Sequence, residues 1–236
     1  MHLELLIEDR SGAVVMQNLL PRMLEGRSAE HTYAIRPHRG RGKVPLDPYQ
    51  PPARFASGLL DLLPAKSRAY KQSYYPEELL IIIIVDSDNE QPEKVFGLVQ
   101  SVMDRFAGTI PYVIGISVEE MEAWLLGDYK AVLAAYPNAD KSVLANYKQD
   151  SICGTWEVLA HALYGKQAKK LIRLGYPAVG QYKHEWARRI APLLDPDRNK
   201  SPSFKRFQRA FDRILSQQEH KAEEHRERVA TMDKEI

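Results

Sequence analysis

The sequence is poor in cysteine, since Cys153 is the only one among 236 residues. A single cysteine excludes an internal disulfide framework and a zinc site built from cysteines, and it is typical of a reducing compartment. Met1 is followed almost at once by an apolar stretch, without a charged leader or cleavage site, and no apolar run is long enough to cross a bilayer. We therefore predict a cytoplasmic protein with no membrane partner.

An excess of one charge sign is also lacking. The chain has 33 lysines and arginines against 31 aspartates and glutamates, a net charge of +2. No global basic field therefore points to nucleic acid, and any such signal must be local. Hydrophobic residues make up 44% of the chain, which is enough for a real core, and the length fits one domain with an appendage or two small domains.

The most informative stretch is LLIIIIVDSD, residues 79–88. Its unbroken β-branched run predicts a strand buried on both faces, at the centre of a mostly parallel sheet. Asp86 and Asp88 follow at its C-terminal end, where ligands bind in open α/β sheets. Residues i and i+2 of an extended chain project to the same side, so we expect the two carboxylates to bind a divalent cation between them. The alternative is an acidic loop that merely caps the next helix.

Strand and helix patterns alternate over the first half of the chain. We expect strands at 2–7, 32–35, 79–86 and 110–116, and helices at 13–24, 53–63, 93–106 and 117–128. This order predicts an α/β fold, with a mostly parallel central sheet flanked by helices, over residues 1–130. Helical patterns such as 155–164, 183–194 and a long helix from Pro202 predict a helical C-terminal region, 131–236, with a polar tail.

Acidic residues follow three of the predicted strands. Glu8 follows the first strand, and Glu119 and Glu122 lie three residues apart after the fourth. Ser117 and Glu120 match a capping box, and acids at a helix start also favour the helix dipole, so each has a structural explanation. Three acidic sites at one sheet edge nevertheless favour a cation site that polarises a phosphate and activates a water molecule.

A basic loop follows the second predicted strand. Residues 36–52 contain Arg36, Arg39, Arg41 and Lys43, then a proline-rich stretch that excludes regular structure. Such a loop is suited to phosphate contacts with nucleic acid, although exposed basic loops are often only solvated.

These motifs resemble the Toprim domain of topoisomerases, primases and overcoming-lysogenisation-defect nucleases. Glu8 and the Asp86-Ser87-Asp88 motif correspond to that family's first glutamate and Asp-x-Asp. The sequence is most similar to an uncharacterised bacterial Toprim-related family, through E-D-R-S-G-A at 8–13, E-M-E-A-W-L-L-x-D at 120–128 and S-P-S-F at 201–204.

The resemblance implies a nuclease that uses Mg²⁺ or Mn²⁺. Glu8 would act as general acid/base or metal ligand, Asp86 and Asp88 would hold the metal, and a glutamate of the 119–122 group would complete the site. Relatives imply an ATPase partner and a role in defence against foreign DNA. Gly12 stands where Toprim nucleases commonly have a second acid, and Asp9 where many have glycine. A non-catalytic module that binds nucleic acid or a partner protein is therefore the alternative.

Overall fold

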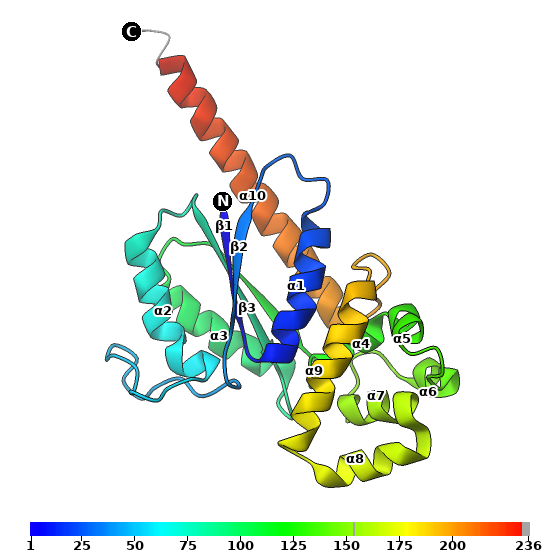
Figure 1. Ribbon diagram of the computed structural model, residues 1–236. Helices are drawn as coiled ribbons and strands as arrows, with labels where there is room; N and C mark the ends of the chain where they lie inside the picture. The colour runs from blue at the N-terminus through cyan, green and yellow to red at the C-terminus, as the bar shows by residue number, and fades with distance from the viewer. Residues whose placement is uncertain (153, 233–236) are drawn as a thin grey trace.

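The chain has a layered α/β fold in the computed structural model, which describes residues 1–152 and 154–232 (Figure 1). Within these ranges four strands form one parallel sheet in the order β2-β1-β3-β4. The strands are β1 (His2–Ile7), β2 (Thr32–Pro37), β3 (Leu79–Asp86) and β4 (Tyr112–Ser117). The predicted fold class is confirmed. Cys153 and the last four residues of the predicted polar tail lie outside the described residues.

Helices connect and follow these strands. They are α1 (Arg10–Leu24), α2 (Leu59–Ser73), α3 (Pro92–Phe106), α4 (Glu122–Gly127), α5 (Tyr129–Ala135), α6 (Lys141–Asn146), α7 (Thr155–Tyr164), the 3₁₀ turn η1 (Gly165–Gln167), α8 (Ala168–Leu174), α9 (Ala178–Ile190), the 3₁₀ turn η2 (Ala191–Leu193) and α10 (Pro202–Met232).

The interior strand β3 explains the apolar run in the sequence. Every residue from Leu79 to Val85 is buried, because strands lie on both sides and helices cover both faces. Its even-numbered side chains join a hydrophobic cluster with α1 and α10, and its odd-numbered side chains join a second cluster with α2 and α3. The two helix layers are visible on opposite faces of the sheet in Figure 1.

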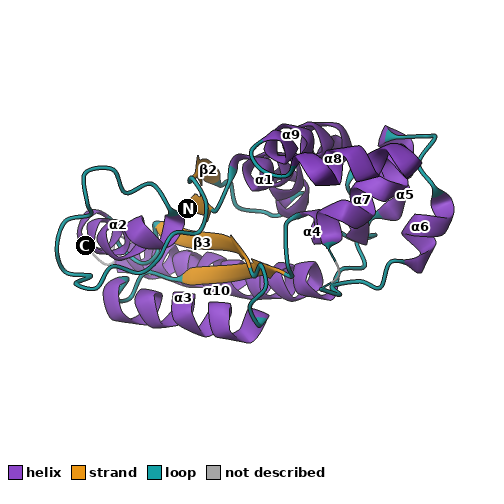
Figure 2. Ribbon diagram, turned by 90° about the horizontal axis from the view of Figure 1, so that it is seen from below, coloured by secondary structure: helices purple, strands orange, loops and turns teal. Residues whose placement is uncertain are grey.

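The C-terminal half packs onto the same core. Helices α4 to α9 lie beside the sheet, and α10 then returns along it (Figure 2). Phe204, Phe207 and Phe211 of α10 are fully buried in the cluster that also contains β1 and α1. Gly115 of β4 permits this close approach, because a Cβ there would lie 2.9 Å from the Phe207 ring. The hydrophobic core is therefore continuous across the predicted domain boundary at residue 130.

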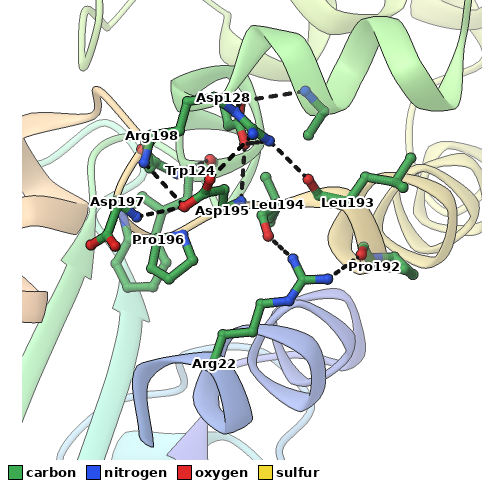
Figure 3. A network of polar contacts seen from close by, with 12 residues as sticks. Arg22, Trp124, Asp128, Pro192, Leu193, Leu194, Asp195, Pro196, Asp197 and Arg198 are labelled. Carbon is green, nitrogen blue, oxygen red and sulfur yellow. Dashed lines mark hydrogen bonds and ion pairs between the residues drawn. The ribbon is translucent and has the colours of Figure 1, made fainter. Parts of the chain in front are cut away.

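A polar network ties the segment before α10 to two other parts of the chain (Figure 3). The buried carboxylate of Asp128 accepts two hydrogen bonds of 2.7 Å from the guanidinium of Arg198. Arg22 of α1 donates to the carbonyl oxygens of Pro192 and Leu194. The segment 192–198 is thus hydrogen-bonded on one side to Asp128, between α4 and α5, and on the other side to Arg22 of α1.

Several predicted element starts are wrong. The helix predicted over 13–24 begins three residues earlier, at Arg10, because the Asp9 carboxylate accepts the N–H of Gly12 at 2.7 Å and caps α1. The helix predicted over 53–63 begins only at Leu59, where Asp61 accepts the N–H groups of Lys43 and Gly58.

The helix predicted over 183–194 also begins earlier than expected. α9 begins at Ala178, directly after Pro177, and proline is tolerated at a helix start. This earlier start gives α9 an additional turn before Lys183.

Candidate functional site

A cavity of about 530 Å³ lies at the carboxyl ends of β1 and β3. Glu8 follows β1, Asp86 ends β3, Asp88 lies two residues further on, and all three line the cavity. The structure thus brings together the three residues that the sequence placed at one sheet edge. The reason is topological, because β1 and β3 are adjacent and parallel.

Glu8 and Asp86 are in direct contact. The N–H of Asp86 donates to Oε2 of Glu8 at 3.0 Å, and the hydroxyl of Ser117 donates to the carboxylate of Asp86. Burial, with the nearby charges of Asp88 and Asp9, raises the pKa of Glu8 to about 7. Burial and the charge of Glu8 also raise the pKa of Asp86 well above its ordinary value. Crowded carboxylates of this kind are stabilised by a proton or a cation.

Asp88 lines the cavity because of a backbone conformation that was not predicted from the sequence. Its φ of +47° is left-handed, so Asp86 and Asp88 are not related by the alternation of an extended strand. The N–H of Asp88 donates to the carbonyl oxygen of Glu119 at 2.8 Å, which fixes this turn. Both aspartates line the cavity, but not for the reason that the sequence suggested.

Glu119 binds a helix start rather than the cavity. Its carboxylate accepts the N–H groups of Gly154 and Thr155 at 2.9 and 2.8 Å, and also the Thr155 hydroxyl. These N–H groups lie at the start of α7, where the helix itself offers no acceptors. The Glu119 carboxylate is therefore engaged away from the cavity, and its role as a metal ligand in the acidic site stays a prediction.

The predicted capping box is not formed either. Ser117 is the last residue of β4, and its hydroxyl is bonded to Asp86 instead of a helix N–H. The helix begins only at Glu122. Glu120 therefore lies in the connecting turn, where it lines the cavity.

Glu120 and Glu122 form ion pairs with Lys183 of α9. The Lys183 ammonium lies 3.2 Å from Oε1 of Glu120 and 3.1 Å from Oε2 of Glu122. Lys183 is 4% exposed and Glu122 only 1%. Burial alone would lower the pKa of Lys183, but the charges of Glu122, Glu120 and Asp86 raise it well above its ordinary value. Lys183 is thus a fixed positive charge beside the acids.

Sequence reasoning missed Lys183 and the wall of the cavity to which it belongs. That wall comes from α9 and the loop before it, and includes Tyr176, Gln181 and His184. A usable signal was present, because Lys183 lies at helical spacing with the buried residues Val179 and Ala187. A lysine in an apolar stripe indicates a buried ion pair.

The predicted nucleic-acid contacts divide into two groups. Arg36 belongs to β2, and its Nε donates to the buried carboxylate of Glu4 at 3.0 Å. Arg39 and Lys43 are exposed. Arg41 contacts the carboxylates of Asp88, at 3.6 Å, and Glu90. The loop therefore lies at the rim of the acidic cavity, although Arg36 is engaged elsewhere.

The donor chemistry of the cavity suits Mg²⁺ or Mn²⁺, since both prefer carboxylate oxygens. No three His, Cys, Asp or Glu side chains in the described ranges are grouped closely enough to form a ready-made metal site. Glu8, Asp86 and Asp88 would therefore hold a cation only after side-chain movement, for which the half-exposed carboxylate of Asp88 has room. Glu122 is paired with Lys183, so its predicted role as a ligand requires breaking that pair.

No family model, curated protein or solved structure matches the chain, so the resemblance to Toprim domains rests on its motifs. Within the described ranges, no helix combines the length and apolarity needed to cross a membrane.

Proposed function

We propose that the protein is a phosphodiesterase that cleaves DNA or RNA with Mg²⁺ or Mn²⁺ as cofactor. The observation that supports this most is the convergence of Glu8, Asp86 and Asp88 on one cavity at the carboxyl edge of a parallel sheet. Three carboxylates in one place repel one another, and a divalent cation removes that repulsion. A bound cation polarises a phosphodiester and supplies hydroxide near neutral pH.

The residues around the cavity have distinct roles in this proposal. Asp86 and Asp88 hold the cation, and Glu8, with a pKa of about 7, accepts or donates a proton near neutral pH. The exposed Arg39 and Lys43 contact the phosphate backbone. Arg41 pairs with Asp88 when no cation is present.

A non-catalytic module that binds nucleic acid or a partner protein is the second candidate. Two observations favour it: Lys183 already supplies a positive charge beside the acids, and the cavity holds no ready-made metal site among the described residues. The ATPase partner and the role in defence that the resemblance implies remain predictions under either candidate.

The deciding experiment incubates the purified protein with plasmid, single-stranded DNA and RNA, with and without Mn²⁺. We expect cation-dependent cleavage that is lost in Asp86→Ala. The melting temperature of this variant should be unchanged or higher, because removal of one carboxylate relieves repulsion. Glu185→Ala is the matched control, since Glu185 is an exposed acid on α9 outside the cavity and its removal should leave cleavage intact.

Retention of cleavage by Asp86→Ala would exclude the proposed mechanism. Thermal shift with millimolar Mg²⁺ or Mn²⁺ gives an independent readout. If neither cation stabilises the wild-type protein and no substrate is cleaved, the non-catalytic module is the better description.

A further inference from the structure

The helix before the cavity wall carries only positive charge on its outer side. Residues 158–184 contain no aspartate or glutamate, although the chain has 31 of them. The basic side chains exposed on η1 and α8 recur every three or four residues, and the buried Ala168 and Leu171 lie on the opposite side of the helix. They therefore form one outward row, which we call the basic stripe: Lys166, Lys169, Lys170 and Arg173.

The charges of the basic stripe are not balanced by the protein itself. Within the described ranges none of its four side chains forms an ion pair, unlike Arg27, Arg36 and Arg198. Of the two acids that bound the stretch, Glu157 is partly buried and Glu185 lies 3.8 Å from Arg189. Four unbalanced charges in a chain with a net charge of only +2 make a local surface that is suited to a polyanion.

Tyr176 lies between the basic stripe and the acidic cavity. It follows α8 by two residues, lines the cavity and is 69% exposed. A Cβ at Gly180 would lie 3.7 Å from the Tyr176 ring, so the ring lies close to the first turn of α9. Among the described residues it stacks on no other aromatic ring. An exposed ring beside a basic surface is a platform on which an unpaired base stacks.

The basic stripe and the loop 36–52 lie on opposite sides of the carboxyl edge of the sheet. Both are at the end of the molecule where β1 and β3 finish (Figure 1). From Lys166 to Arg173 the helical rise is about 10 Å, which is roughly the length of three phosphates in one strand. Tyr176 comes three residues after Arg173, so the stripe leads directly to the cavity mouth.

We propose that the basic stripe and Tyr176 bind single-stranded DNA or RNA, with successive phosphates on the stripe and one base stacked on the tyrosine. This inference rests on the proposed nuclease function, because it assigns the phosphodiester in the acidic cavity to an unpaired strand. Inside a duplex, neighbouring bases cover both faces of each base, so an exposed ring at the cavity mouth favours a single strand. A flat anionic membrane would also attract the stripe, but it could not enter a cavity of about 530 Å³.

Fluorescence anisotropy in EDTA measures binding apart from cleavage. The probes are labelled oligo-dT, labelled oligo-rU and a DNA duplex of the same length. We expect the better single strand to bind at least about fivefold more tightly than the duplex. Tyr176→Ala should weaken single-strand binding about fivefold or more, and Tyr176→Phe should retain it because the ring remains.

The salt dependence of binding tests the basic stripe. Lys169→Gln combined with Lys170→Gln should reduce the slope of log K against log salt by about 1.4, since each phosphate contact with a single strand contributes about 0.7. Lys141→Gln combined with Lys148→Gln is the matched control, because both lysines are exposed and neither lines the cavity. It should leave the slope unchanged. All four lysines are exposed, so folding should survive, which circular dichroism checks.

Three results would overturn the inference: no single-strand binding by the wild type, an unchanged salt slope in the double variant of the stripe, or binding to phosphatidylserine vesicles in preference to both oligonucleotides. Cleavage with Mn²⁺ separates this inference from the nuclease proposal. If the stripe variant binds weakly but the wild type cleaves nothing, the nuclease proposal fails and the binding surface stands. If the wild type cleaves and the stripe and tyrosine variants bind normally, the binding surface is wrong and the nuclease proposal stands.

Discussion

Glu8 makes the protein's stability depend on pH. Its pKa in the folded protein is about 7, above the ordinary value of 4.5, because burial and nearby acids disfavour the charged form. Its contribution to the free energy of unfolding is therefore complete below pH 4.5 and is lost as the pH rises through about 7. Replacement of Glu8 by an uncharged residue should remove this loss.

We expect Glu8→Gln to stabilise the protein increasingly as the pH rises from about 5 to about 8, by about 1–3 kcal/mol at the upper end. Urea unfolding at both pH values measures this difference. Glu185→Gln serves as the control, since Glu185 is exposed on α9. A stability difference between wild type and Glu8→Gln that does not grow with pH would show that Glu8 titrates normally.

The sequence predicted the acids that follow strands, but not the direction of every side chain. Glu8 and Asp86 could be placed because strand order and parallel pairing determine where strands end. Glu119 could not, because its φ of +64° turns its side chain toward α7, and a single sequence does not show which glutamate adopts that conformation. The role of Lys183 could not be predicted either, because its ion pairs with Glu120 and Glu122 join segments that lie about sixty residues apart in the chain.

At the scale of single elements, α7 depends on an acid from another part of the chain. Glu119→Ala should lower the free energy of unfolding by about 1–3 kcal/mol, because the N–H groups of Gly154 and Thr155 lose their acceptor. Cation binding at the cavity, followed by thermal shift, should persist. Glu77→Ala, at an exposed loop acid, should leave stability unchanged. Loss of the cation response in Glu119→Ala would place Glu119 in the site after all.

The contact between β4 and α10 depends on one glycine. Gly115→Ala should lower the free energy of unfolding by about 1–3 kcal/mol, because the new Cβ would lie 2.9 Å from Phe207. Gly97→Ala in α3 is the opposite case, since nothing lies within 4 Å of its added Cβ, and it should stabilise by about 0.5–1 kcal/mol. Equal effects of the two changes, measured by thermal unfolding, would contradict this packing.

Strong periodic patterns predicted elements better than capping motifs did. The side chains of the apolar run in β3 can only pack in the core, so the position of this strand was predicted closely. Ser117 matched a helix cap, yet tertiary contacts use its hydroxyl for Asp86. Phe55 fitted a helical spacing but is 88% exposed, because α2 begins after it.

At the scale of the whole molecule, the α/β half should not fold alone. Removal of residues 131–236 deletes Phe204, Phe207 and Phe211 from the cluster that covers β1 and β4. We expect fragment 1–130 to aggregate or to show no cooperative melting by circular dichroism. A cooperative transition in this fragment would show that the sheet is stable without α10.

The sequence suggested a division at residue 130 because composition changes there, from strand–helix alternation to short helices. Composition does not show which face those helices cover. The packing of α10 depends on Gly115 and on three phenylalanines that lie roughly a hundred residues further along the chain, a pairing that periodicity does not reveal.

The two walls of the acidic cavity are also separated in time during synthesis. Glu8, Asp86 and Asp88 leave the ribosome well before Lys183 and the rest of α9. A nascent chain at that stage carries the negative side chains without the ammonium group that later balances them and without α10 over the sheet. The acidic cavity is therefore completed only late in translation, and an unfinished chain has only one of its two walls.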